Sequence, residues 1–189
     1  ALYNFEKPVV LFTLTWGDHH HFIIPEFMID VIKHTLNNYT WIIRLHPIVY
    51  TKKEHRDKIE DFFSEYFTEK ENKKLFWKEF NTLPLPLILT KTLTHITIES
   101  SVVVEAAQFG VTSLILNNKV IEYGPNGETT PPYGGPSYFK KEIELGYAEV
   151  YHMGLNIQDW IAQQKRKKPL INLKINKEGA LLCQTNPFT

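Results

Sequence analysis

Two serines stand where an apolar strand gives way to a helix. Ser100 and Ser101 follow the apolar segment 94–98, and the helical segment 100–110 closes with Gly110. The first backbone N–H groups of a helix have no partner within it, and the helix dipole adds positive charge there. Two hydroxyl groups supply further donors, so this turn is typical of a phosphate-binding site. The alternative is that one serine only caps the helix.

A second set of donors lies at the end of another apolar strand, 40–47. Arg44 and His46 lie two residues apart, which places both side chains on one face if the strand stays regular. Pro47 ends the strand and directs His46 away from the sheet edge. An imidazole there can bind a phosphate oxygen or protonate a leaving phosphate. The alternatives are a histidine bonded to local backbone and an arginine in a structural ion pair.

Two further candidates come from the same helix and from the first loop. Glu105 lies one turn beyond Ser101, where a carboxylate can accept hydrogen bonds from ribose hydroxyls or simply face solvent. We also predict that Gly17, in the loop after the first strand 8–16, contributes to phosphate binding. The adjacent histidines 19–21 lack the spacing of a known zinc motif, so we expect no metal site.

The order of apolar segments predicts how these residues come together. Strands are expected at 8–16, 40–47, 74–80, 94–98, 112–117 and 147–152, and helices at 25–38, 51–67, 84–93, 100–110, within 137–146, and at 156–168. This alternation is typical of a parallel sheet covered by helices on both faces. In such sheets ligands bind at the carboxyl ends of the strands, where the strand order reverses. We therefore predict an α/β, Rossmann-like, doubly wound parallel sheet of about six strands.

Composition limits the classes of function. The 189 residues carry 21 basic and 21 acidic side chains, a balance that indicates no nucleic-acid partner. The basic run 165–168 is interpreted as the solvated end of the last helix, with contact to anionic lipid as the alternative. One cysteine excludes an internal disulfide, and no run of 18 apolar residues encodes a membrane span. We expect a cytoplasmic protein, or one held peripherally at the inner face of the membrane.

Two segments resemble a known family. The segment "THITIESSVVVEAAQFGVTSLIL" (94–116) resembles the C-terminal, nucleotide-sugar-binding half of GT-B glycosyltransferases. The segment "WIIRLHP" resembles the His-Pro motif of bacterial sialyltransferases, CDP-glycerol glycerophosphotransferases and capsule polysaccharide transferases. The resemblance implies that His46-Pro47 and Ser100-Ser101 contact the nucleotide phosphate. Glu105 matches the glutamate of the family's Glu-Ala pair.

The resemblance, which covers roughly residues 8–165, implies a donor-binding domain of a metal-independent glycosyltransferase in bacterial surface polysaccharide biosynthesis. The donor would be a nucleotide sugar linked to CMP or CDP, with no other cofactor, and His46 would be the catalytic residue at the leaving phosphate. The acceptor would be a glycan or a lipid-linked molecule.

A GT-B enzyme has two Rossmann-like domains, and this chain has room for one. We expect that domain at 1–169, followed by a tail, 170–189, whose structure the sequence does not predict. The chain enters a buried strand at once and lacks an initiator methionine, so we expect it to belong to a longer protein. The N-terminal acceptor domain would then lie outside it, and this chain alone would be inactive.

Two other functions stay open. A nucleotide-sugar epimerase of the UDP-N-acetylglucosamine 2-epimerase type shares the architecture, although its serine turn is typically glycine-rich. A non-catalytic Rossmann-like module that binds a partner protein would show no affinity for nucleotides. It would also show no clustering of His46 with Ser100 and Ser101.

Overall fold

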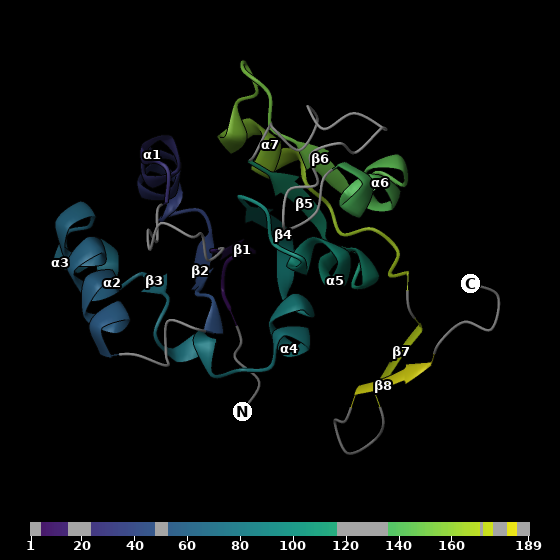
Figure 1. The fold of residues 1–189 in the computed structure, drawn as a ribbon, viewed down its shortest axis with the longest axis horizontal. Coiled ribbons are helices and arrows are strands. Elements are labelled where there is room, and N and C mark those ends of the chain that lie inside the picture. Colours follow the sequence, from purple (N-terminus) through teal and green to yellow (C-terminus); the bar gives the residue numbers. More distant parts are fainter. Residues whose placement is uncertain are drawn as a thin grey trace.

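An open sheet of parallel strands forms the centre of the protein (Figure 1). The computed structural model describes residues 5–14, 24–47, 53–116, 136–170, 172–175 and 181–184. The strands of the sheet are β1 (Val9–Thr13), β2 (Thr40–Arg44), β3 (Leu75–Phe76), β4 (Thr92–Thr97), β5 (Thr112–Ile115) and β6 (Ala148–Val150). The predicted α/β, Rossmann-like fold is confirmed, with strand ends shifted by a few residues.

The strand order is β3-β2-β1-β4-β5-β6, and every neighbouring pair is parallel. The order reverses between β1 and β4, which is the doubly wound arrangement. Thr13, the last residue of β1, is in register with Arg44 on β2 and with Thr97 on β4. These three strands therefore end level with one another at the carboxyl edge of the sheet.

Helices cover both faces of the sheet. One face carries α1 (Glu26–Thr35), α2 (Lys53–Tyr66) and α7 (Ile157–Gln163), and the other carries α4 (Leu85–Leu89), α5 (Val102–Gln108) and α6 (Pro136–Glu144). The short elements α3 (Glu69–Asn72) and η2 (Glu79–Asn81) flank β3 along the chain. Within β1, Val10 and Phe12 pack into the first layer, and Val9 and Leu11 into the second. Because both faces are covered, the strand is apolar throughout.

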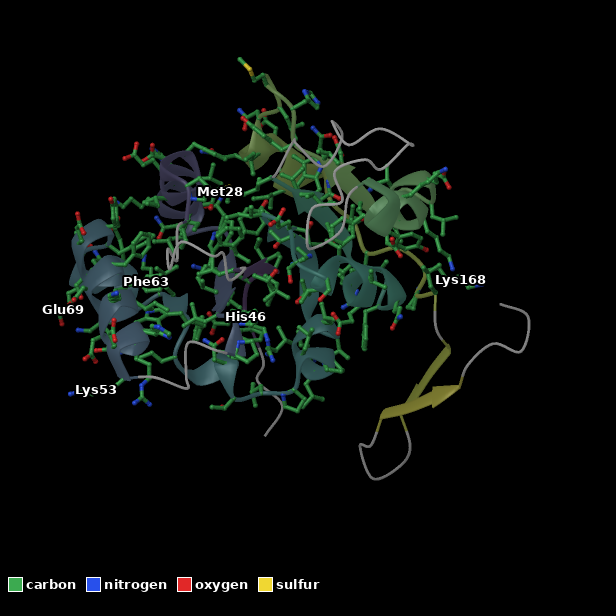
Figure 2. All side chains as sticks on the ribbon, in the orientation of Figure 1. Met28, His46, Lys53, Phe63, Glu69 and Lys168 are labelled. Atoms are coloured by element: carbon green, nitrogen blue, oxygen red, sulfur yellow. The ribbon has the colours of Figure 1, made fainter. Side chains whose placement is uncertain are left out.

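The helices on the first face turn an apolar stripe toward the sheet. Figure 2 shows Met28 and Phe63 on the sheet-facing sides of α1 and α2, whereas Lys53 and Glu69 point outward. Met28 is 0% exposed and Phe63 is 1% exposed. Burying a side chain of this size contributes about 1.5–3 kcal/mol to folding. Pro25, immediately before α1, has the fixed φ that suits a helix start.

The end of α5 requires a glycine. The N–H of Val111 donates to the carbonyl oxygen of Ala106 at 2.9 Å, and the N–H of Gly110 donates to that of Ala107 at 3.0 Å. This is a Schellman motif, and Gly110 takes the left-handed conformation that it needs, with a φ of 75°. A Cβ atom on Gly110 would also collide with the backbone carbonyl of Lys167. The predicted terminal glycine is confirmed.

The last predicted helix, 156–168, is shorter than expected. Asn156 caps its start, but α7 ends at Gln163, and Gln164 is extended with φ −69° and ψ 141°. The basic run 165–168 therefore is not the end of a helix, and that prediction is wrong. Residues 164–170, which we call the strap, instead pass along the amino-terminal edge of the sheet, where the N–H of Lys167 donates to the carbonyl oxygen of Gly110 at 2.8 Å.

The cations of the strap bind the ends of three helices. Arg166 donates from Nη2 to the carbonyl oxygen of Phe109 at 2.8 Å and from Nη1 to that of Thr90, the residues that cap α5 and α4. Lys167 Nζ donates to the carbonyl oxygen of Gly146, just beyond α6. Helix C-termini carry unpaired carbonyls and the negative end of the helix dipole, so they attract cations. These bonds account for the non-helical course of the basic run.

The C-terminal tail holds a separate pair of strands. β7 (Asn172–Ile175) and β8 (Leu181–Gln184) pair antiparallel and form a sheet of their own (Figure 1). Leu173 lies opposite Cys183 in this ladder. The sequence left this region without a predicted structure.

Candidate functional site

The topology defines where a ligand would bind. After β1 the chain crosses to α1 on one face of the sheet, and after β4 it turns into α5 on the other face. Because α1 and α5 lie on opposite faces, the strand order reverses between β1 and β4, and doubly wound sheets bind their ligands beyond the carboxyl ends of these strands. We call this place the switch point. Gly17, in the connection after β1, lies outside the described residues.

Ser100 and Ser101 form the turn between β4 and α5, as predicted. The N–H groups of Val103 and Val104 donate to the carbonyl oxygens of Ser100 and Ser101 at 3.1 and 2.9 Å. The N–H of Val102 donates to Ser100 Oγ at 3.3 Å. Three N–H groups at the helix start are thus already bonded, and Ser100 acts partly as a local cap.

Ser101 differs from its neighbour. Its side chain is exposed and makes no capping bond to α5. Within the described part of the chain, its hydroxyl and the backbone N–H groups of Ser100 and Ser101 have no hydrogen-bond partner. These are the donors that this turn can offer to an anionic ligand.

Arg44 lies at the end of β2 and its guanidinium group is held by backbone. Its Nη1 donates to the carbonyl oxygen of Leu83 at 2.9 Å and to that of Phe80 at 3.4 Å. These bonds fix a half-buried cation beside the switch point, because Arg44 is in register with Thr13. The arginine thus has a structural role in the segment after η2, and its positive charge remains at the carboxyl edge.

Asn81 holds the strand end that precedes His46, a role that sequence reasoning missed. The N–H of Leu45 donates to Asn81 Oδ1 at 2.8 Å, and Asn81 Nδ2 lies 3.5 Å from the carbonyl oxygen of Ile43 and also bonds that of Trp77. β3 pairs with β2 only at Trp41 and Ile42. The Asn81 side chain therefore bonds β2 backbone beyond the end of β3.

His46 and Pro47 lie past the end of β2 and are exposed (His46 is labelled in Figure 2). Because β2 ends at Arg44, strand alternation does not extend to His46. The expectation that Arg44 and His46 share a strand face therefore fails. His46 directly follows Leu45, whose backbone N–H donates to Asn81 Oδ1.

Glu105 lies on α5, one turn after Ser101, and its side chain is exposed at the surface. Desolvation by the surrounding protein nevertheless raises the pKa of Glu105, and the positive charge of Arg44 opposes that rise. The opposing effect links α5 to β2 across the switch point. A carboxylate in this position can accept hydrogen bonds from neutral hydroxyl groups.

Some site types have no counterpart in the described residues. Within them, no group of three histidine, cysteine, aspartate or glutamate side chains could hold a metal ion. Nor does any helix in that part of the chain have the length and apolar character needed to cross a membrane.

Comparison with known proteins gives structural matches only. No family model matches the chain, and no curated protein matches it in sequence. The glycosyltransferase of kitacinnamycin has 12% identity and a TM-score of 0.50, over 83% of this chain and 34% of that one. The wall teichoic acid polymerase TagF has 16% identity and a TM-score of 0.43, over 75% and 35%. A Listeria monocytogenes protein assigned as a UDP-N-acetylglucosamine 2-epimerase has 16% identity and a TM-score of 0.39, over 86% and 40%.

At 12% identity, the match to the kitacinnamycin glycosyltransferase shows the fold and nothing finer. The resemblance to glycosyltransferases noted in the sequence is confirmed at the level of fold, through the kitacinnamycin enzyme. The chain spans 34% and 35% of the first two of these proteins, about a third of each. What the whole protein does is therefore a matter of proposal.

Proposed function

We propose that this chain is the donor-binding part of a metal-independent glycosyltransferase that acts in bacterial surface polysaccharide biosynthesis. Its ligand would be a nucleotide sugar, linked to CMP or CDP, bound at the switch point. The acceptor, a glycan or lipid-linked molecule, and the catalytic base would be bound by a second domain of a longer protein. The proposal rests on the geometry of the carboxyl edge together with the fold.

One observation carries the proposal. The donors of the Ser100–Ser101 turn, the Arg44 cation and the Glu105 carboxylate come from the β4–α5 connection, β2 and α5, and β2 and β4 lie on either side of β1. Groups that far apart in sequence thus lie at or just beyond the carboxyl ends of β2 and β4, where a doubly wound sheet binds its ligand. Donors and a cation suit a phosphate, and a carboxylate suits ribose hydroxyls.

These residues would have distinct roles in the reaction. As the bond between the sugar and the nucleotide breaks, negative charge develops on the leaving phosphate. Ser101 and the backbone N–H groups of the turn would donate hydrogen bonds to it, and Arg44 would stabilise its charge. His46 would act as the catalytic residue, donating a proton or hydrogen bond to the leaving phosphate. Glu105 would orient the ribose.

The test is calorimetric titration of the 189-residue chain with CMP, CDP, UDP and GDP. We expect one nucleotide to bind, and both His46→Ala and the double variant Ser100→Ala/Ser101→Ala to weaken it about tenfold or more, as for loss of a hydrogen bond to a charged group. His34→Ala is the matched control, because His34 is an exposed histidine in the last turn of α1, at the opposite edge. It should bind as the wild type does.

Binding that both variants leave unchanged would remove His46 and the serines from the site. A chain that binds none of the four nucleotides would favour a non-catalytic interaction module of the same fold.

A further inference from the structure

A chain of three polar side chains runs through the centre of the sheet. His95, in the middle of β4, contacts Thr13 Oγ1 through Nε2 at 2.8 Å and Ser113 Oγ through Nδ1 at 2.9 Å. The three residues come from β1, β4 and β5. The proposed function assigns no role to these three side chains. Polar side chains among apolar strands are costly to bury unless they are hydrogen-bonded.

The side chains of Thr13, His95 and Ser113 have more polar protons than hydrogen bonds between them. Burial lowers the pKa of His95 to about 3, so the ring is neutral near pH 7 and carries one N–H. With the hydroxyls of Thr13 and Ser113, three protons are available, but only two hydrogen bonds join the three side chains. Among the described residues, one hydroxyl proton therefore has no acceptor, and the tautomer of His95 decides at which end.

Burial favours one of the two ends. If His95 carries its proton on Nδ1, the ring donates to Ser113 and the spare proton stays on Ser113, which is 0% exposed. A buried donor without an acceptor costs about 1–3 kcal/mol. If the proton is on Nε2, the ring donates to Thr13 and the spare proton belongs to Thr13. Thr13 is 3% exposed and is the only one of the three with any surface.

Thr13 is also where a donor would be useful. It is the last residue of β1 and lies at the switch point, in register with Arg44 and Thr97. Its own carbonyl oxygen accepts a hydrogen bond from Thr97 Oγ1 at 3.0 Å, which ties the ends of β1 and β4 together. Thr13 thus lies where the paired carboxyl ends of β1 and β4 meet at the switch point.

We propose that His95 is a positioning residue that keeps its proton on Nε2 and thereby makes the Thr13 hydroxyl a donor for an anionic oxygen at the switch point. The ligand that fits is the phosphate of the nucleotide, so this inference rests on the proposed function. His95 does not touch the ligand. It accepts from Ser113, donates to Thr13, and sets the direction in which Thr13 donates.

The first experiment determines the tautomer in the ligand-free protein. A long-range ¹H–¹⁵N correlation spectrum distinguishes a protonated ring nitrogen from an unprotonated one, and His95→Gln assigns the signal. We expect His95 to be protonated at Nε2 and unprotonated at Nδ1. A proton on Nδ1 overturns the proposal, whether or not any nucleotide binds.

The second experiment measures the ligand role. We expect Thr13→Val to weaken CDP binding about tenfold, because it replaces the hydroxyl by a methyl group of similar shape, and Thr13→Ser to stay within about twofold of the wild type. The same titrations with inorganic phosphate test whether the phosphate alone accounts for the difference. Equal CDP affinity in Thr13→Val and the wild type overturns the ligand role.

The two failures are distinguishable. If the serine variants lose CDP affinity and Thr13→Val does not, the proposed function stands and this inference fails. If the wild type binds no nucleotide, the proposed function fails, and the tautomer of His95 still decides whether it positions Thr13.

Discussion

At the amino-terminal edge of the sheet, the ends of α4, α5 and α6 are bound by Arg166 and Lys167 of the strap. At the carboxyl edge, His46, Ser101 and Glu105 are exposed. The first edge uses its charges to complete the fold. The second edge leaves polar groups at the surface, where they can meet a ligand.

The two edges show two different roles for charged side chains, one in stabilising the fold and one in offering groups to a ligand. The basic run 165–168 is the densest cluster of cations in the sequence, yet Arg166 and Lys167 bind carbonyl oxygens of the same chain. The carboxyl edge has fewer charges, but they converge from separate strands. Local charge density is therefore a poor guide to a ligand site, and convergence at the switch point is a better one.

The largest effect is expected from the interior that separates the two edges. The pKa of His95 falls from 6.5 to about 3 on burial, so the unfolded chain binds more protons than the folded one between these values. Stability should be fully present above pH 6.5 and should fall by on the order of 4 kcal/mol as the pH drops to 3. Urea unfolding at a series of pH values measures this.

His95→Gln is the comparison for that titration, because glutamine takes up no proton in this range. Its stability should depend less steeply on pH between 6.5 and 3. Equal slopes in the variant and the wild type would show that folding does not lower the pKa of His95. If the variant does not fold, direct titration of the His95 ring by NMR gives the same answer.

Gly110→Ala should destabilise the amino-terminal edge of the sheet, where the strap packs. The new Cβ would meet the backbone carbonyl of Lys167, and the φ of 75° is unfavourable for alanine. We expect a loss of about 3 kcal/mol in the free energy of unfolding, measured in urea. Gly154→Ala is the control, because Gly154 has a φ of 98° and open space around it. It should cost about 1 kcal/mol. Equal losses would mean that the strap does not pack on Gly110.

Arg166→Ala should weaken the same edge by a smaller amount. It removes the two bonds to the carbonyl oxygens of Thr90 and Phe109, which we expect to cost about 1.5 kcal/mol in the free energy of unfolding. Lys165→Ala, an exposed neighbour, should change stability by less than about 0.5 kcal/mol. Neither variant should change nucleotide affinity. A loss of affinity in Arg166→Ala would place part of the ligand site at the amino-terminal edge.

Protonation of Glu105, at the carboxyl edge, should have the smallest effect, a loss of nucleotide affinity. Desolvation raises its pKa, so on acidification it takes up a proton earlier than an ordinary glutamate. The protonated form is a weaker acceptor for ribose hydroxyls, so CDP affinity should fall about fivefold below that pKa. Calorimetry across acidic pH tests this, with Glu105→Gln as the comparison. The variant should bind CDP with the lower affinity at every pH. Its affinity should change with pH only as far as the CDP phosphate itself titrates. A wild type and variant with parallel profiles would exclude Glu105 from the ribose.

The sequence predicted what depends on local pattern. The continuous apolar strands and Gly110 at the end of α5 each follow from the chemistry of neighbouring residues. The alternation of strands and helices then implied the fold. The position of Ser100 and Ser101 at the β4–α5 turn came from the same reasoning.

What the sequence could not show depends on contacts between distant residues. Asn81 bonds β2 backbone from 36 positions along the chain, and the Thr13–His95 contact joins residues 82 positions apart. The strap was misjudged because helix periodicity says nothing of the carbonyl groups that attract its cations. The one available signal was a histidine in the middle of an apolar strand, which indicates a buried polar partner without naming it.

Chemical-shift mapping tests the central claim most directly. Backbone amide spectra of ¹⁵N-labelled protein would be recorded during titration with CDP, and with UDP as the second probe. The account predicts that the shifts gather at the ends of β1, β2 and β4 and in the first turn of α5, and that Phe109, Gly146 and the strap stay unchanged. Shifts centred on the strap, or spread over both edges alike, would contradict it.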